Sequence, residues 1–253
     1  MTSPCVCVTG STHGIGYAIA EAFAHQGARL VINSHLPDNG AQRRLGALAE
    51  CHFVQADLSS VAGARNFIEA AHRALGRLDT LVNNAGTFRD VAFEDLEEEN
   101  FDRTFDLNVK GYLFAAQAFV RMLRPEQHGA SIICVGSTNS LAAEKNSVVY
   151  DASKGAVLML IRSMAVTLAR RGIRVNGVGP GIIETPLTEA GLSRPHVRQT
   201  LEAQIPMGRI GQVADVGEAA VFLASPSARY ITGQMLYVDG GILANQMSWE
   251  PPA

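Results

Sequence analysis

Short apolar runs alternate with longer amphipathic segments along nearly the whole chain, and this alternation restricts the possible folds more than any other feature. The strand-like runs are 5–9, 28–33, 51–55, 79–83, 130–136, 173–178 and 235–238. The helical patterns are 15–26, 39–49, 60–76, 97–123, 148–171 and 213–224. Strands separated by helices are typical of a parallel sheet with helices on both faces. We therefore predict an α/β fold with a doubly wound parallel sheet.

The size and composition of the chain suit one such unit. It has 253 residues, of which 47% are hydrophobic and 18% charged, enough apolar material for a large core. No repeat, low-complexity stretch or linker interrupts the alternation, so we expect a single domain over residues 1–253.

Charge and targeting patterns argue against several partners. The net charge is −3, the pI is near 6.2 and there is no basic block, so nucleic acid is not an expected partner. No apolar run approaches the roughly 20 residues that span a bilayer, and no leader precedes a cleavage site. The four cysteines lie in strand-like runs without a Cys/His cluster, which predicts reduced thiols and no metal. We expect a cytoplasmic protein that does not bind membranes.

Polar or turn-forming residues lie at or just after most of the predicted strands. In a parallel sheet these positions meet at one edge, where ligands bind near the switch in strand order. The residues in question are Thr9, Ser34, Asp57, Asn84, Ser137 and Pro180. The sequence therefore predicts a binding site at the carboxyl edge of the sheet.

A glycine-rich segment, Thr9-Gly10-Ser11-Thr12-His13-Gly14-Ile15-Gly16, follows the first predicted strand and precedes a predicted helix. Its spacing is Gly-x-x-x-Gly-x-Gly, which differs from the Gly-x-Gly-x-x-Gly dinucleotide fingerprint. Glycines let the backbone approach a pyrophosphate, and the helix start offers unpaired N–H groups and the positive end of its dipole. The segment is a candidate nucleotide site.

Tyr150 follows Ser137 by thirteen residues, and Lys154 follows Tyr150 by four within a predicted helix. Residues at this spacing share a helix face, so the ammonium can approach the phenol. A nearby positive charge favours the phenolate and lowers the pKa of a tyrosine from its usual ~10. A tyrosine and a lysine on an ordinary amphipathic helix would show the same spacing, so this interpretation depends on the rest of the chain.

Taken together, these features resemble the short-chain dehydrogenase/reductase family over about residues 5–241. The residues that carry the resemblance keep the order and spacing of the family: Thr9 to Gly16, Asp57-Leu58, Asn83-Asn84-Ala85-Gly86, Asn108, Ser137, Tyr150 with Lys154, Pro180-Gly181, and Asp239-Gly240-Gly241. The resemblance implies a Rossmann-like fold and an NAD(P)-dependent oxidoreductase that acts on a secondary alcohol or a ketone.

The resemblance also implies the residues that bind the cofactor. They are Gly10, Ser11, His13, Gly14, Ile15, Gly16, Ser34, His35, Asp57, Leu58, Asn84, Ala85, Gly86, Tyr150, Lys154, Pro180, Gly181, Ile183 and Thr185. The glycine-rich turn would surround the phosphates, Asp57 and Leu58 the adenine, and the last four residues the nicotinamide. An asparagine-stabilised turn is a second interpretation of the Asn83-Asn84-Ala85-Gly86 run, with Asn83 the more structural residue.

The choice between NAD and NADP depends on the end of the second strand. A carboxylate there would bind a ribose diol and repel a 2′-phosphate, but this chain has Ser34. NADP-preferring relatives often carry an arginine where this chain has His13 and His35, which are only partly charged at pH 7. We favour NADP over NAD.

The resemblance assigns the chemistry to Asn108, Ser137, Tyr150 and Lys154. Tyr150 would act as general base and acid, and Lys154 would lower its pKa and bond the nicotinamide ribose. Ser137 would hold the substrate oxygen about 3 Å from the phenol. Asn108 would bend a helix and hold a water that links Lys154 to solvent; an ordinary amide on a helix surface is the alternative.

The substrate is left open by the sequence. Residues after Ser137 and the stretch from Glu184 to Pro206 should wall the pocket, with 186–193 as a mobile lid. Asn139, Glu144 and Asn146 either bind a polyhydroxylated substrate or are solvated loop residues. Resemblance is greatest to sugar or polyol dehydrogenases and to 3-oxoacyl-[acyl-carrier-protein] reductases. An acyl-carrier partner would call for a basic patch beside the cleft, and the sequence does not indicate one.

Two further expectations concern the protein as a whole. A catalytically idle relative that senses dinucleotide or acts as a scaffold is a third functional alternative, but the complete set of catalytic candidates argues against it. The wide apolar surface of the predicted helix 148–171 favours subunit contacts, and family members often form tetramers, so we expect a homotetramer.

Overall fold

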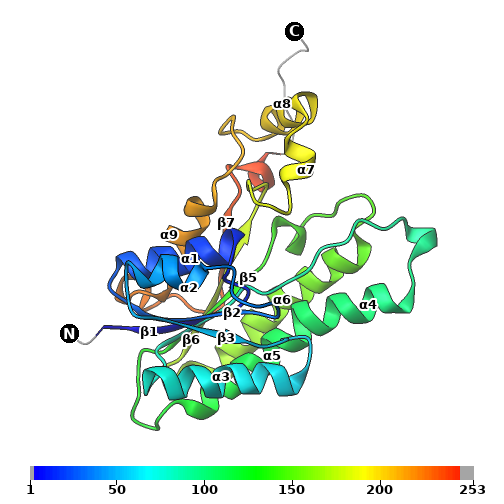
Figure 1. The fold of residues 1–253 in the computed structure, drawn as a ribbon. Coiled ribbons are helices and arrows are strands. Elements are labelled where there is room, and N and C mark those ends of the chain that lie inside the picture. The colour runs from blue at the N-terminus through cyan, green and yellow to red at the C-terminus, as the bar shows by residue number, and fades with distance from the viewer. Residues whose placement is uncertain (1–2, 246–253) are drawn as a thin grey trace.

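A seven-stranded parallel sheet forms the centre of the structure, a computed structural model that describes residues 3–245 (Figure 1). Its strands are β1 Cys5–Val8, β2 Arg29–Ser34, β3 Cys51–Gln55, β4 Thr80–Asn83, β5 Ser131–Val135, β6 Arg174–Pro180 and β7 Met235–Val238. Their order is β3-β2-β1-β4-β5-β6-β7, and each neighbouring pair is parallel. The order switches between β1 and β4, as in doubly wound sheets. The predicted fold class is confirmed.

Helices cover both faces of this sheet (Figure 1). One face carries α1 Gly14–His25, α2 Ala41–Gly46 and α9 Val213–Ala224. The other face carries α3 Val61–Leu75, α5 Gly111–Met122 and α6 Val148–Leu168, with α4 Glu98–Phe105 packed against α6. The two faces therefore have separate apolar cores.

Successive side chains of β1 enter different cores. Cys7 packs in the core that contains Phe67 of α3, whereas Val8 packs in the core that contains Ile19 of α1. All four of these side chains are buried, and each fully buried apolar side chain of this size stabilises the fold by about 1.5–3 kcal/mol. The four cysteines of the chain are free, buried thiols.

Close packing of α1 against α9 holds the helix that follows the glycine-rich turn. At Gly217 of α9 a Cβ atom would lie 2.9 Å from the carbonyl oxygen of Ala18. A glycine inside a helix costs roughly 0.5–1 kcal/mol relative to alanine, and here it allows the two helices to touch. The position of α1, and with it the turn before it, is fixed by this contact.

The predicted helix 97–123 is interrupted in the structure. A π-helical turn, Asp106–Lys110, joins α4 to α5. Such a turn adds a residue within an otherwise continuous helix, so apolar periodicity continues on both sides of it. The sequence pattern therefore predicted one long helix where there are two.

The stretch 186–193, which was expected to be a mobile lid, contains the short helix α7 Glu189–Leu192, and α8 Pro195–Gln204 follows it. Both helices lie beyond the carboxyl ends of the strands (Figure 1), and the segment 186–204 is called the lid from here on. Leu192, Ile205 and Ile210 form a small apolar cluster beneath them. The lid is thus a folded unit with its own core.

The helical stretch Val148–Arg171 is long and apolar enough to cross a membrane by length and composition. We predicted no such run from the sequence. A helix that packs on the face of a buried sheet has the same composition, and α6 packs against β6. Its residues Tyr150 and Lys154 point to the cavity described below.

Candidate active site

The glycine-rich turn is held by backbone contacts with the turn after β4. Gly10 and Gly14 have φ angles of +59° and +57°, which favour glycine. A Cβ atom on Gly10 would lie 2.8 Å from Cα of Ala85. The Asn84 amide donates to the carbonyl oxygens of Thr9 (2.9 Å) and Gly10 (2.8 Å). The Asn84 side chain therefore supports the turn, and its loop offers a cofactor mainly backbone atoms.

Ser11 has a similar supporting role. Its hydroxyl donates to the carbonyl oxygen of Val8 (2.7 Å) and accepts from the backbone N–H of Asn33 (3.0 Å), and the residue is fully buried. The Asn33 side chain in turn accepts from the N–H of Gly10 (3.2 Å). Asn33 was missed by the sequence analysis because a polar residue inside a strand shows no partner until the neighbouring strand is known.

The predicted adenosine-side residues lie after β2 and β3. The Ser34 hydroxyl accepts from the N–H of Leu36 (3.0 Å), and His35 is exposed beside it. Asp57 accepts from the N–H of Ser59 (3.0 Å), and this backbone hydrogen bond lowers the pKa of the carboxyl group. These residues offer a neutral hydroxyl, an imidazole and an ionised carboxylate at the edge of the sheet.

One cavity of about 200 Å³ brings together most of the residues predicted to surround the nicotinamide. The predicted residues that line it are Ile15, Asn84, Gly86, Ser137, Tyr150, Lys154, Pro180, Gly181, Ile183 and Thr185. Leu187 and Thr188 also line it, from the stretch 184–206 that was predicted to wall the pocket. Four further lining residues were not predicted: Thr87, Phe88, Val135 and Gly136. The other predicted cofactor residues lie outside this cavity, along the glycine-rich turn and after β2, β3 and β4.

Lys154 is buried beneath the cavity. Its Nζ atom donates to the carbonyl oxygen of Val135 (3.0 Å), which also accepts from the Tyr112 hydroxyl (3.2 Å). The same Nζ lies 5.5 Å from the centre of the Tyr150 ring. Burial lowers the pKa of Lys154 to about 8. The ammonium is thus close to the phenol but is directed to a backbone oxygen.

The pKa of Tyr150 differs from the expectation. The ring keeps part of its surface open to the cavity, but the surrounding protein removes water from the phenol and raises its pKa to about 12. A hydrogen bond with Ser137 opposes this rise, and the carboxylates of Glu144 and Asp151 add to it. Lys154 does not lower this pKa as predicted, because its ammonium bonds to Val135 and is itself destabilised by burial.

The polar residues after Ser137 have different environments. Asn139 is buried, and its amide nitrogen donates to Asp151 (2.7 Å), so it is not a free substrate ligand. Glu144 is exposed. Asn146 adopts a left-handed φ of +64°, and its carbonyl oxygen accepts from the N–H of Val91 (3.0 Å). Asn146 therefore has a turn-forming role.

Asn108 lies in the π-helical turn and is fully buried, so the surface-amide alternative is wrong. Its side chain accepts from the N–H of Thr87 (2.8 Å) and donates to the carbonyl oxygen of Thr87 (3.0 Å). It also donates to the Ser153 hydroxyl (3.1 Å). The side chain thus ties the loop after β4, one wall of the cavity, to the helix that carries Tyr150.

The lid is anchored next to the nicotinamide-side residues. The Thr188 hydroxyl donates to the carbonyl oxygen of Ile183 (2.7 Å) and lies 3.1 Å from the Thr185 hydroxyl. Arg198 of α8 forms an ion pair with Glu184, which also accepts from Gln212 (3.0 Å). Opening the lid would break these contacts.

A metal centre has no candidate in the described part of the chain. Between residues 3 and 245, no three His, Cys, Asp or Glu side chains gather closely enough to hold an ion. The reactive side chains that line the cavity are a phenol, an ammonium and a hydroxyl, next to a turn suited to a dinucleotide.

Comparisons with known proteins match nearly the whole chain. A family model described as enoyl-(acyl carrier protein) reductase matches residues 10–243. The chain is 37% identical over 250 residues to L-rhamnose 1-dehydrogenase (NAD(P)(+)) of Azotobacter vinelandii, with 95% of this chain and 96% of the relative covered.

Two solved structures extend the comparison. One is a gluconate 5-dehydrogenase from Burkholderia cenocepacia J2315 in complex with NADP and tartrate, with a TM-score of 0.89, 33% identity and 97% of each chain covered. The other is a 3-oxoacyl-[acyl-carrier protein] reductase from Brucella melitensis in complex with NAD. Its TM-score is 0.92 and its identity 31%, with 98% of this chain and 100% of that chain covered.

The fold, the cavity and these matches define a class of protein. The chain belongs to the short-chain dehydrogenase/reductase family, as the sequence analysis predicted. It is an NAD(P)-dependent oxidoreductase that acts on CH–OH groups. The prediction of an enzyme of this class is confirmed.

Proposed function

We propose that the chain, as one catalytic domain over residues 1–253, interconverts a secondary alcohol and a ketone on a sugar, a polyol or a related hydroxy compound. One observation carries this proposal. Ser137, Tyr150 and Lys154 line the same cavity as Pro180 and Ile183, which the family resemblance assigns to the nicotinamide. The names of two relatives, an L-rhamnose 1-dehydrogenase and a gluconate 5-dehydrogenase, support the substrate class.

The residues of the cavity have complementary roles in this proposal. Tyr150 takes the hydroxyl proton during oxidation and returns it during reduction, a contribution of about 10²–10⁴-fold for a general acid–base group. Ser137 holds the substrate oxygen, and Lys154, whose Nζ atom lies 5.5 Å from the centre of the Tyr150 ring, bonds the nicotinamide ribose. The bound cofactor supplies the hydride acceptor or donor. Phe88, whose ring meets the Tyr150 ring edge-on at 5.0 Å, helps to exclude water.

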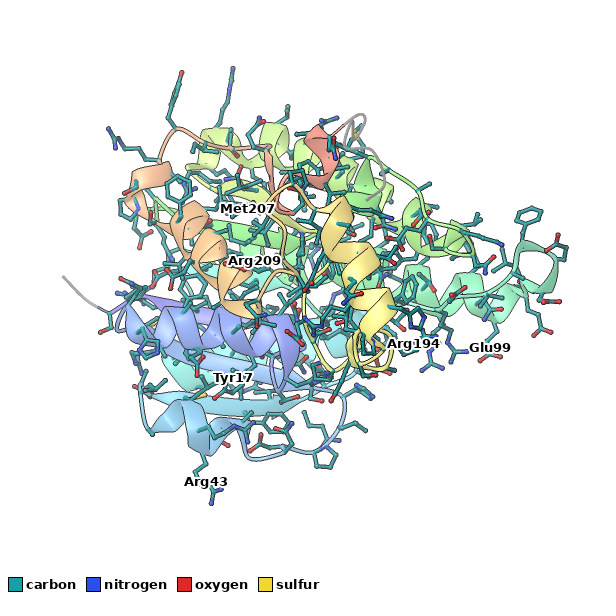
Figure 2. The ribbon with its side chains drawn as sticks, turned by 90° about the horizontal axis from the view of Figure 1, so that it is seen from above. Tyr17, Arg43, Glu99, Arg194, Met207 and Arg209 are labelled. Carbon is teal, nitrogen blue, oxygen red and sulfur yellow. The ribbon has the colours of Figure 1, made fainter. Side chains whose placement is uncertain are left out.

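We favour NADP as the cofactor because nothing acidic occupies the end of β2, where Ser34 lies. His35 is exposed next to it, and Asn39 donates to the carbonyl oxygen of Thr12 (3.1 Å), which brings the segment after β2 to the glycine-rich turn. Arg44 bonds to Asn39 (3.2 Å) and adds positive charge there. The neighbouring Arg43 projects away from α2 into solvent (Figure 2).

A 3-oxoacyl-[acyl-carrier-protein] reductase is the second candidate, favoured by the description of the family model and by the Brucella structure. An acidic carrier protein would need a basic docking surface. Arg198, on α8 of the lid, is paired with Glu184 and Glu202 and so adds no free positive charge there. The segment 94–102 before and within α4 exposes several carboxylates instead. These charges favour a small-molecule substrate.

The subunit arrangement and location are also proposals. Exposed apolar side chains lie on α5 and α6, where Met159 is 56% and Val166 is 82% exposed. Exposed apolar positions on paired helices fit contacts between copies, so we propose a homotetramer in the cytoplasm without nucleic-acid or membrane partners. A monomer mass by light scattering would contradict the tetramer.

A screen tests the proposed function directly. Purified protein is mixed with NADP⁺ or NAD⁺ and with L-rhamnose, D-glucose, D-gluconate, ribitol or simple secondary alcohols, and the reduced nicotinamide is followed by absorbance. We expect reduction with at least one sugar, polyol or sugar acid, and none by Tyr150→Phe under the same conditions. Activity only on 3-oxoacyl thioesters would support the second candidate. Tight cofactor binding with no turnover of any compound would support the idle relative.

A further inference from the structure

A chain of hydrogen bonds leads from a carboxylate to the proposed catalytic serine. Asp151 accepts from the Asn139 amide nitrogen (2.7 Å). The Asn139 amide oxygen accepts from the Ser137 hydroxyl (3.0 Å). Ser137 lies within hydrogen-bonding reach of the Tyr150 phenol. Asn139 and Ser137 are 7% and 8% exposed, so water has little access to the middle of this chain.

The direction of the chain is set at its Asp151 end. An ionised carboxylate only accepts hydrogen bonds, so the Asn139 side chain must present its NH₂ group to Asp151 and its oxygen to Ser137. The carboxylate is held by two other donors, the Ser147 hydroxyl (2.7 Å) and the backbone N–H of Glu144 (3.1 Å). These bonds prevent it from turning away from Asn139.

The Ser137 hydroxyl has one proton and two acceptors that compete for it. One is the Asn139 oxygen, and the other is the oxygen of Tyr150 or of a substrate. The backbone N–H of Asn139 also donates to the Ser137 oxygen (3.1 Å) and holds it in place while the proton changes direction. A hydrogen bond from a charged or strongly polarised partner makes the Asn139 oxygen a better acceptor.

We propose that Asp151 and Asn139 are positioning residues that hold the proton of Ser137 on Asn139 until negative charge develops on the Tyr150 or substrate oxygen. This proposal rests on the proposed function. No bond to hydrogen is broken in the change, because the proton stays on the serine oxygen and only its hydrogen bond moves. When Tyr150 is neutral, Ser137 accepts from it; when Tyr150 is ionised, Ser137 must release Asn139 and donate to the phenolate. The chain therefore favours the neutral phenol.

Several other groups lie near the same phenol, and any influence they have must be separated from that of the hydrogen-bond chain. Lys154 and Asp151 lie on α6 with Tyr150, and Glu144 lies in the loop before this helix. Tyr112 comes from α5. Glu144 acts on Tyr150 by charge at least as strongly as Asp151 does, but its side chain does not bond to Asn139. The pair Asp151 and Glu144 thus offers a matched comparison.

The first experiment uses a variant that changes no charge. The ionisation of Tyr150 is followed by the ultraviolet difference spectrum of tyrosinate, with NADP⁺ bound and with Tyr150→Phe as reference. Asn139→Ala should lower the pKa of Tyr150 by about one unit, because the Ser137 proton is then free to stabilise the phenolate. In a Ser137→Ala background the same substitution should have no effect. An unchanged or raised pKa, or an equal fall without Ser137, would overturn the proposal.

The second experiment compares two carboxylates at constant side-chain volume. Asp151→Asn removes the charge and one acceptor oxygen at the end of the hydrogen-bond chain, whereas Glu144→Gln removes a charge that lies outside it. The fall in the Tyr150 pKa should be larger for Asp151→Asn; an equal or larger fall for Glu144→Gln would contradict the proposal. Because the titration needs no turnover, it gives an answer even if the substrate screen fails.

Discussion

The two halves of the proposed site are built in different ways. Around the glycine-rich turn, polar side chains such as Ser11 and Asn84 bond to the protein itself, and the backbone faces the ligand. Around the cavity, the reactive groups of Tyr150 and Lys154 lie in a desolvated environment that shifts their pKa values to about 12 and about 8. The first half depends on backbone shape, and the second on burial and charge.

This difference predicts which properties change together. A substitution that disturbs the glycine-rich turn should alter both stability and cofactor affinity, because the same contacts support both. A substitution that removes the reactive hydroxyl of Tyr150 or Ser137 should alter turnover while cofactor affinity stays nearly constant. Four substitutions or conditions test this separation.

The largest effect is expected for Tyr150→Phe. Removal of the hydroxyl should lower turnover by about 10²-fold or more, because the proton of the substrate then has no acceptor. The dissociation constant of NADP⁺, measured by fluorescence titration, should stay within a few-fold of the parent value. Near-normal turnover would remove Tyr150 from the mechanism, and a large loss of affinity would show that the two halves are not separable.

Gly10→Ala is expected to have the next largest effect. The new Cβ atom would lie 2.8 Å from Ala85 at a φ of +59°, so stability should fall by about 2 kcal/mol and cofactor affinity should fall with it. Gly27→Ala is the matched control, because Gly27 has a φ of +75° but no neighbour within 4 Å. It should cost about 1 kcal/mol and leave affinity unchanged. Denaturant unfolding and cofactor titration measure both. Equal costs would mean that the contact with Ala85 contributes nothing.

Ser34→Asp should change the preference between cofactors by about tenfold in favour of NAD, because a carboxylate repels the 2′-phosphate and bonds the ribose diol. Ser34→Asn has nearly the same shape without the charge and should leave the preference almost unchanged. The ratio of kcat/KM values for NADP⁺ and NAD⁺ measures this. If Ser34→Asp and Ser34→Asn had the same ratio of kcat/KM values, the 2′-phosphate would not bind next to residue 34.

The smallest effect concerns pH. Oxidation needs ionised Tyr150, and since burial raises its pKa, the ionised fraction is small near neutrality and grows as pH rises. Oxidation should therefore increase from about pH 6 to pH 9, whereas reduction, which uses the neutral phenol, should not increase. The pH profiles of kcat/KM in both directions check this sign. Oxidation that slows as pH rises over this range would contradict the proposed base.

Much of the fold was predictable because it depends on local patterns. The runs that became β1, β2, β4, β5 and β6 are buried almost throughout, so they are visible as largely apolar segments, whereas the edge strands β3 and β7 are only partly buried. The π-helical turn at Asp106–Lys110 was not predictable, because apolar periodicity continues through it. The helices α7 and α8 were not predicted either, because their segment is short and mostly polar. Two of the three residues in its small apolar core, Ile205 and Ile210, follow α8 in the chain.

The residues of the candidate site that belong to family motifs were predictable from the sequence. Those whose role depends on a hydrogen bond to another segment were not. Ser137, Tyr150 and Lys154 line one cavity as expected. The supporting role of Asn33 and the link from Asn139 to Asp151 were missed because each depends on a partner from another segment. The pKa of Tyr150 was expected to fall because spacing shows the nearby Lys154 but not how far both groups are desolvated.

The most direct test is a crystal structure of the complex with NADP⁺ and a substrate found in the screen. We predict that the substrate oxygen lies within hydrogen-bonding distance, about 3 Å, of both the Tyr150 phenol and the Ser137 hydroxyl, with the nicotinamide beside Pro180 and Ile183. A complex in which these two side chains face away from the nicotinamide, or bind no substrate oxygen, would contradict the proposed mechanism.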